Sequence, residues 1–98
     1  MVNMATYVTL YRYTDEGIKQ IKRAPEIAQG WMAEAQKRGV TVKELYWLQG
    51  AADAVTVVES DDEDAVNSLM LAIGAQGFLR TETMRGISLE DLTRSLDF

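Results

Sequence analysis

Residues 4–13 are MATYVTLYRY, the stretch from which the fold of this chain is best predicted. β-Branched and aromatic residues dominate it and alternate, and alternation sends successive side chains to opposite faces of a strand. One face receives Tyr7, Tyr11 and Tyr13, and the other receives Met4, Thr6, Val8 and Leu10. The stretch therefore predicts a β-strand with large side chains on both faces.

Helix signals follow this strand directly. Residues 14–16 (TDE) offer a capping hydroxyl and two carboxylates for the positive end of a helix, which we expect to reach about Arg23. The only proline, Pro25, cannot lie inside a helix, so a second helix is expected to restart there and to end at Gly39. Residues 14–39 are therefore predicted to form two helical pieces with a break before the proline.

The segments that follow alternate between strand and helix signals. Strands are predicted over residues 40–49 and 54–59, which form a hairpin, and over residues 78–86. Before the last strand, Ser60 and Glu63 fit a capping box that opens another helix. The apolar face of this helix consists of Val66, Leu69, Met70 and Ile73.

The resulting order of elements is βαββαβ. We predict an α+β chain with the ferredoxin-like plait, a four-stranded antiparallel sheet with both helices on one face. Residues 1–87 form this domain, and residues 88–98 form an amphipathic helical tail with Leu89, Leu92 and Leu96 on one side. The sequence leaves open whether the tail packs on its own domain or on a neighbouring dimer.

The composition excludes several classes of protein. The 98 residues include no cysteine and no histidine, which removes disulfides, thiolate nucleophiles, imidazole bases and the usual zinc and haem sites. A net charge of −5 argues against nucleic-acid binding. Because neither a membrane-spanning run nor a signal peptide is evident, we expect no membrane association and a cytoplasmic location. We also expect no metal and no cofactor.

The sheet face that the helices leave uncovered is the first indication of function. The first two strands contribute four large aromatic residues, Tyr7, Tyr11, Tyr46 and Trp47. An exposed face that carries several aromatic residues needs a partner, and a second copy related by two-fold symmetry is the commonest solution. We expect these four residues to form a dimer interface or a ligand pocket. The alternative is that they fill the core.

Candidate polar groups are few. Arg80 and Glu82 lie two residues apart, so they share one face of the fourth strand. They could hold a polar ligand, or they could form a surface ion pair on an edge strand. Asp53, in the hairpin loop, could act as a general base near tyrosine hydroxyls, but a turn residue that bonds its own backbone is the simpler interpretation.

Three segments together resemble one protein family. Residues 5–19 (ATYVTLYRYTDEGIK), 43–55 (KELYWLQGAADAV) and 80–86 (RTETMRG) are similar to the GYD domain family of small bacterial and archaeal proteins. The resemblance implies a ferredoxin-like fold of the dimeric α/β-barrel kind. In the family motif Gly-x-Tyr-Asp, Gly50 and Asp53 match, whereas Ala52 stands at the tyrosine position.

Three functions are consistent with these observations. The leading hypothesis is a homodimeric, non-catalytic module that binds a small molecule or a protein, because no catalytic constellation is evident and the family tyrosine is absent. The alternative is a cofactor-independent enzyme of the oxygenase, isomerase or cyclase type, with a pocket beside the sheet. Its candidate residues are Tyr7, Tyr11, Arg80 and Glu82. The third hypothesis is a self-assembling structural subunit that forms larger oligomers.

Overall fold

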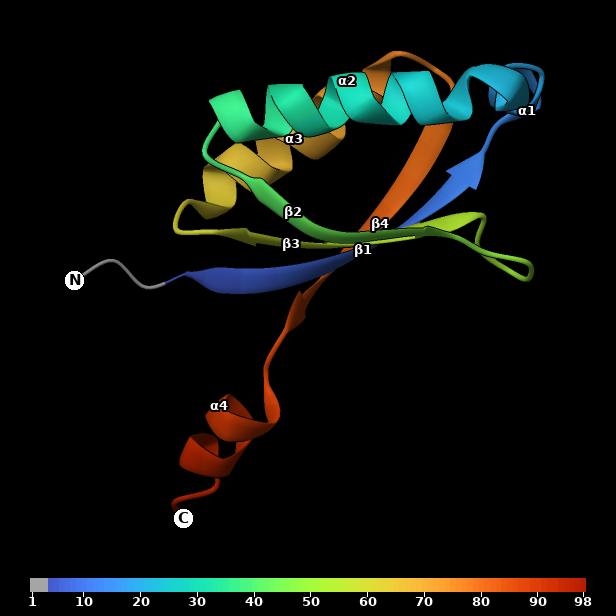
Figure 1. Cartoon of the computed structure of the whole chain (residues 1–98). Helices are drawn as coiled ribbons and strands as arrows, with labels where there is room; N and C mark the ends of the chain where they lie inside the picture. Colours follow the sequence, from blue (N-terminus) through green and yellow to red (C-terminus); the bar gives the residue numbers. More distant parts are fainter. Residues whose placement is uncertain (1–3) are drawn as a thin grey trace.

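The computed structural model describes residues 4–98, and its strands and helices follow one another in the predicted order (Figure 1). The strands are β1 (Ala5–Tyr13), β2 (Thr41–Trp47), β3 (Ala54–Ser60) and β4 (Leu79–Gly86). The helices are α1 (Asp15–Ile18), α2 (Ala24–Lys37), α3 (Glu63–Ala75) and α4 (Leu89–Ser95), with a 3-10 turn, η1, at Ile21–Arg23. Residues 1–3, which the sequence assigns to the same domain, lie outside the described part of the chain.

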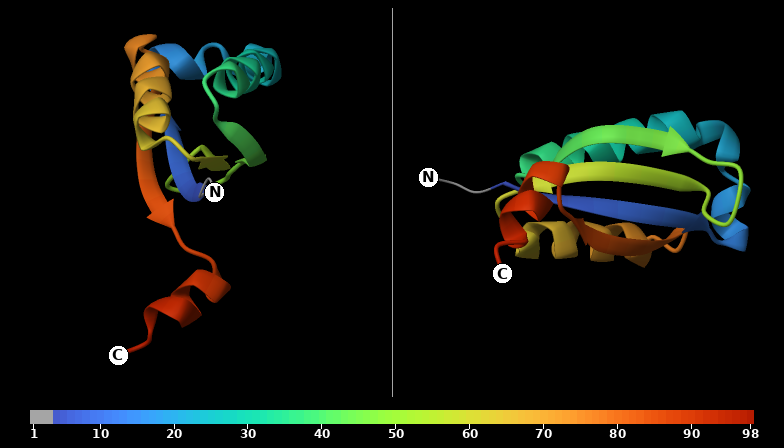
Figure 2. Two further views of the ribbon diagram at one scale, coloured as in Figure 1. Left: turned by 90° about the vertical axis from the view of Figure 1, so that its left-hand side faces the viewer. Right: turned by 90° about the horizontal axis from the view of Figure 1, so that it is seen from below.

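The four strands form one antiparallel sheet in the order β2-β3-β1-β4. Both long helices, α2 and α3, cover the same face of this sheet (Figures 1 and 2). The opposite face, which we call the open face, has no helix packed directly on it, and α4 lies further out on that side. This arrangement confirms the predicted α+β, ferredoxin-like fold.

The register of β1 fixes which residues share a face, because β1 has a neighbouring strand on each edge. Val8 is opposite Val57 of β3 and Met84 of β4. Directly opposed residues project to the same side of a sheet, so these three side chains lie on the open face. Tyr7, one residue earlier, is opposite Val58 and projects under the helices, where it is only 6% exposed.

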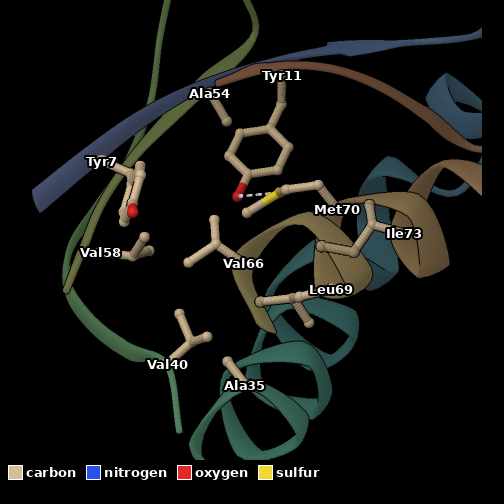
Figure 3. Packing of buried hydrophobic residues seen from close by; sticks show 10 residues of the cluster. All are labelled: Tyr7, Tyr11, Ala35, Val40, Ala54, Val58, Val66, Leu69, Met70 and Ile73. Carbon is tan, nitrogen blue, oxygen red and sulfur yellow. Dashed lines mark hydrogen bonds between the residues drawn. The ribbon is translucent and has the colours of Figure 1, made fainter. Parts of the chain in front are cut away.

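The hydrophobic core lies between the covered face of the sheet and α2 and α3 (Figure 3). It contains Tyr7, Tyr11, Ala35, Val40, Ala54, Val58, Val66, Leu69, Met70 and Ile73. The prediction that Tyr7 and Tyr11 belong to the uncovered face is therefore wrong, because both are buried in the core. The reason is the pairing of β1 with β3, which places both tyrosines on the side that the helices cover. Their role in a ligand pocket stays a prediction.

The helix starts follow the sequence signals with one exception. Thr14 accepts a hydrogen bond from the Gly17 amide at 3.0 Å, and α2 begins beside Pro25, both as predicted. The predicted capping box is wrong, because the residue that caps α3 is Asp62, which accepts from the Ala65 amide. Ser60 is instead fully buried at the end of β3. Its hydroxyl donates to the Gly39 carbonyl, just before β2, at 2.9 Å.

Two glycines in helices give opposite predictions for stability. Gly30 lies exposed inside α2, and a β-carbon there would meet no atom within 4 Å. Glycine inside a helix is less stable than alanine by about 0.5–1 kcal/mol, so Gly30→Ala should raise the free energy of unfolding in urea by that amount. A β-carbon on Gly17 would collide with the Phe78 backbone carbonyl, so Gly17→Ala should lower it. Changes of the same sign in both variants would contradict this account of the packing.

A second prediction concerns Tyr11 at alkaline pH. Burial raises the pKa of the Tyr11 phenol, and its hydrogen bond to Thr56 partly offsets the rise. A folded-state pKa above the unfolded one gives stability that is complete below about pH 10 and is lost as pH rises further through the raised value. Urea unfolding between about pH 7 and pH 11 should therefore show a steeper alkaline loss in the wild type than in Tyr11→Phe.

The same variant has an expected effect at neutral pH. Tyr11→Phe leaves the buried Thr56 hydroxyl without the partner that it has at 2.9 Å, which should cost about 1 kcal/mol of unfolding free energy. Parallel alkaline slopes in the two proteins would show that ionisation of Tyr11 does not oppose folding.

Candidate binding site

A cavity of about 100 Å³ lies between the sheet and the two long helices. We call it the Trp47 cavity. Its floor is the covered face of the sheet, including Tyr11 and Thr56, and its walls are side chains of α2 and α3, such as Trp31 and Ile73. The Tyr11 hydroxyl lies 2.9 Å from Thr56 Oγ1 and donates to Met70 Sδ at 4.0 Å (Figure 3). These polar atoms are thus already paired with one another.

The rim of the Trp47 cavity lies where β1 and β2 end and β4 begins. Tyr13 is opposite Leu79 at this end of the sheet, and the Trp47 indole nitrogen donates to the Tyr13 hydroxyl at 3.0 Å. Trp47 and Phe78 both line the cavity and remain 44% and 37% exposed. Ile18, next in sequence to the lining residue Gly17, is also exposed. The rim is therefore an exposed aromatic and aliphatic surface.

The chemistry of the Trp47 cavity is apolar. Among the described residues that line it, none is acidic or basic, and the polar ones are tyrosine, threonine, glutamine and the tryptophan nitrogen. An apolar cavity of about 150 Å³ holds a benzene molecule. The Trp47 cavity is smaller and therefore suits an aliphatic group of a few carbon atoms, such as the side chain of a leucine or valine.

The small side chains of α2 explain why this space exists. The residues that α2 turns toward the cavity include Ala24, Ala28 and Ala35. Alanine is too short to fill the distance between a helix and a sheet, so the α2 residues that reach into this space are the longer Ile27, Trp31 and Met32. A pocket beside the sheet was predicted, but its lining was not, although three alanines on one helical stripe were the available signal.

The open face is the second unpartnered surface. Its centre is a set of half-buried aliphatic side chains from the two central strands, Val8, Leu10, Val55 and Val57. Met84 and Tyr46 extend this apolar surface onto the edge strands and are 42% and 57% exposed. The prediction of an apolar uncovered face is confirmed, but its apolar character comes mainly from valines rather than from tyrosines.

The four aromatic residues predicted to act together are divided between the two faces. Tyr7 and Tyr11 lie in the core, Trp47 lies at the cavity rim, and Tyr46 alone lies on the open face. The Tyr46 hydroxyl donates to the Glu44 carboxylate at 3.2 Å on that face. Because adjacent strand residues point in opposite directions, Tyr46 lies on the open face and Trp47 on the covered face, at the cavity rim.

The polar candidates do not converge on the tyrosines. Arg80 is opposite Arg12 and Glu82 is opposite Leu10, so both lie on the open face. Their spacing correctly predicted that they share one face of β4. Glu82 pairs with Arg12 at 3.8 Å, and in the described part of the chain Arg80 has no ion pair. Because the core tyrosines lie on the other side of the sheet, the four candidate catalytic residues do not share a pocket.

The family motif occupies the loop between β2 and β3 and has a structural role. The Asp53 carboxylate accepts from the Tyr13 amide at 2.8 Å, and the Asp53 amide donates to the Tyr11 carbonyl at 2.8 Å. The interpretation that Asp53 bonds its own loop is therefore wrong, because its carboxylate ties the loop to the end of β1. Ala52 is buried beside it, and Gly50 is exposed at the loop tip.

Two further contacts were absent from the predictions. The Arg85 guanidinium lies 5.8 Å from the centre of the Tyr7 ring, a cation–π distance. Tyr13 holds the Trp47 side chain at the rim, as described above. Both contacts join strands that are distant in sequence, so no local pattern could reveal them.

Membrane-spanning helices and metal sites are two further features to consider in residues 4–98. No helix in this part of the chain combines the length and the apolar character needed to cross a bilayer. The same residues contain no cluster of three or more acidic side chains placed to hold a metal ion.

Comparisons with known proteins agree with this architecture. The chain is 32% identical over 94 residues to the "Glutamine synthetase and cystathionine beta-lyase binding protein" of Thermus thermophilus. The alignment covers 95% of this chain and 99% of that relative. The crystal structure of MtbAldR matches with a TM-score of 0.62 at 14% identity, covering 86% of this chain. The chain spans about half of that structure, 52% of its length. This likeness supports the fold alone.

The family comparison extends over almost the whole chain. The model of the GYD domain matches residues 7–96, from β1 through α4. The match includes the loop that holds Asp53 as well as the open face and the Trp47 cavity. The chain therefore belongs to the GYD domain family.

Proposed function

We propose that this chain is a non-catalytic, homodimeric module that binds another protein. The observation that carries the proposal is the Thermus relative, which is named for binding two enzymes and which aligns with this chain over nearly the full length of both. By this homology, glutamine synthetase and cystathionine beta-lyase are the first partners to test. The proposal assigns one role to each of the two unpartnered surfaces.

The Trp47 cavity is the proposed contact site for the partner enzyme. Protein interfaces gain most of their affinity from a few central residues, often tryptophan or tyrosine, that pack in desolvated pockets inside a ring of contacts that excludes water. The exposed Trp47 and Phe78 side chains at the rim, and an apolar space of about 100 Å³ behind them, fit this pattern. We therefore expect the partner to insert one aliphatic side chain into the cavity.

The open face is the proposed contact between two copies of the chain. Val8, Leu10, Val55 and Val57 form a continuous aliphatic surface at its centre. A two-fold axis in the plane of contact would place this surface against its own equivalent, which is how isologous dimers form. The pair of Arg12 and Glu82 on the same face supplies both charge signs for a self-complementary rim.

A small apolar molecule is the second candidate ligand of the Trp47 cavity. Its apolar lining favours such a molecule, but pockets for drug-sized ligands measure about 300–1,000 Å³, so only a small group would fit. The cofactor-independent enzyme is not proposed, because the geometry separates Tyr7 and Tyr11 from Arg80 and Glu82. A larger structural assembly is tested by the mass measurement below.

The first test uses two neighbouring residues that point to opposite faces. Trp47→Ala removes a rim residue, so it should weaken the affinity for purified glutamine synthetase or cystathionine beta-lyase from the same organism at least about tenfold. Tyr46→Ala is the matched control, with a similarly exposed aromatic side chain on the open face. Isothermal titration calorimetry measures both variants. Equal losses in the two variants, or no binding of either enzyme by the wild type, would contradict the proposal.

The second test concerns the dimer. Val57→Glu places a carboxylate in the aliphatic centre of the open face, where desolvating an unpaired charge is costly. Light scattering on a sizing column should give the wild type twice the monomer mass of 11.0 kDa and the variant the monomer mass. A Trp47→Ala variant that keeps the dimer mass would show that the two surfaces act separately. A wild-type monomer would contradict the dimer, and a larger mass would favour the structural-assembly hypothesis.

A further inference from the structure

We infer that α4 packs against a second copy of the chain and completes the dimer interface that the open face begins. The inference rests on the homodimer of the proposed function and adds the residues of the helical tail to it. It assigns α4 to the partner copy rather than to its own domain or to the bound enzyme.

α4 has an apolar side that its own chain leaves exposed. Leu89, Leu92 and Leu96 are spaced by three and four residues, so they line one side of the helix, and they are 83%, 42% and 54% exposed. Ile87, just before the helix, is 55% exposed. Together these side chains form an exposed apolar stripe, whereas a helix of a folded protein normally turns such a stripe toward a core.

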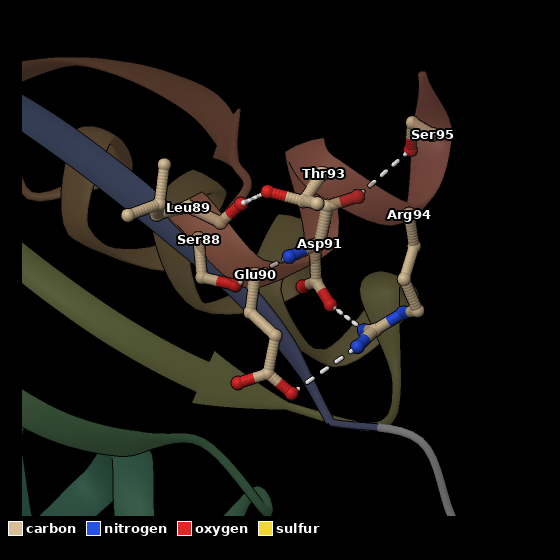
Figure 4. A network of polar contacts seen from close by, with 7 residues as sticks. All are labelled: Ser88, Leu89, Glu90, Asp91, Thr93, Arg94 and Ser95. Atoms are coloured by element: carbon tan, nitrogen blue, oxygen red, sulfur yellow. Dashed lines mark hydrogen bonds and ion pairs between the residues drawn. The ribbon is translucent and has the colours of Figure 1, made fainter. Parts of the chain in front are cut away.

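The polar contacts of α4 are all local. On the opposite side of the helix, Arg94 forms ion pairs with Glu90 and with Asp91 (Figure 4). The Ser88 hydroxyl caps the helix by accepting from the Asp91 amide at 3.0 Å. In the described part of the chain, no hydrogen bond or ion pair joins residues 88–98 to the rest of the domain.

A helix of this length needs a packing partner. α4 has seven residues, whereas isolated helices shorter than about 12–15 residues are marginally stable in water. The cap and the ion pairs stabilise its ends, but the stability of short helices in proteins comes mainly from packing of the apolar side. The helix therefore requires a surface that covers its leucines.

The position of α4 indicates which surface this is. Figures 1 and 2 show α4 on the open-face side of the sheet and set apart from it, at the end where β1 begins. The Cα radius of gyration is 14.5 Å and the longest dimension is 49 Å, whereas a compact chain of this length has a radius of about 13 Å. The tail thus extends into the space that a second copy on the open face would occupy.

The open face alone is smaller than a standard protein interface, so a stable dimer needs an additional contact. Its strands have seven to nine residues. At about 3.3 Å per residue and about 4.8 Å between strands, four of them cover about 500 Å² in projection. A standard protein interface buries about 800 Å² on each partner. Reciprocal packing of α4 on the second copy would supply the missing area, and the two-fold axis would make this contact twice.

The first experiment compares two substitutions on opposite sides of α4 that change the net charge by the same amount. Leu92→Asp places a charge on the apolar side, and Arg94→Gln is the matched control on the polar side, where Arg94 pairs with Glu90 and Asp91. Sedimentation equilibrium of the full chain should show a dimer dissociation constant at least about tenfold higher for Leu92→Asp than for the wild type. It should show little change for Arg94→Gln. Neither residue belongs to the core, so both variants should keep the wild-type fold.

The second experiment distinguishes the second copy from the other surfaces. Hydrogen exchange of the α4 amides is followed over protein concentrations that span the dissociation constant. Protection of residues 92–95 should rise with the dimer fraction, because the helix is marginal when unpartnered. Protection independent of concentration would assign α4 to its own domain. Protection that rises only when glutamine synthetase is added would assign it to the enzyme, and either result would overturn the inference.

The outcomes also separate this inference from the proposed function. A dimer that persists unchanged in Leu92→Asp would overturn the role of α4 and leave the homodimer standing. A wild type that remains monomeric at all concentrations would overturn both. Enzyme binding by the Trp47 cavity is measured independently and is affected by neither result.

Discussion

The central position of β1 is the constraint on which the other features depend. Because β1 is paired on both edges, a shift of one residue in its register would exchange the covered face for the open face. Thr9 shows how this register is held. It is fully buried, and its hydroxyl lies 2.8 Å from the Thr83 hydroxyl on β4. This register pairs the buried hydroxyl, and it also places the tyrosines under the helices and the valines outside.

Much of the fold could be predicted because its signals are local. The break before Pro25 and the apolar stripe of α3 each depend on residues within one segment, and both were correctly predicted. The choice of face for Tyr7 and Tyr11 was not local. A strand with large side chains on both sides does not indicate which side the helices cover. That choice depends on partners such as Thr56, which is 45 residues away from Tyr11.

The candidate site was harder to predict for the same reason. The shared face of Arg80 and Glu82 followed from the two-residue period of a strand, but the ion-pair partner of Glu82 is Arg12, at the other end of the chain. Asp53 has a backbone partner 40 residues away. The lining of the Trp47 cavity comes from strands and helices that are distant in sequence, so a pocket beside the sheet could be expected but its residues could not be identified.

The alanines of α2 that face the cavity have a thermodynamic consequence. Unfilled apolar volume costs a folded protein packing contacts, so the Trp47 cavity represents stability that the chain does not use. Larger side chains at Ala28 or Ala24 would be the simplest way to recover it. A domain with such an unfilled cavity is less stable than one with a filled core. A molecule that binds in the cavity of the folded state would therefore stabilise the domain.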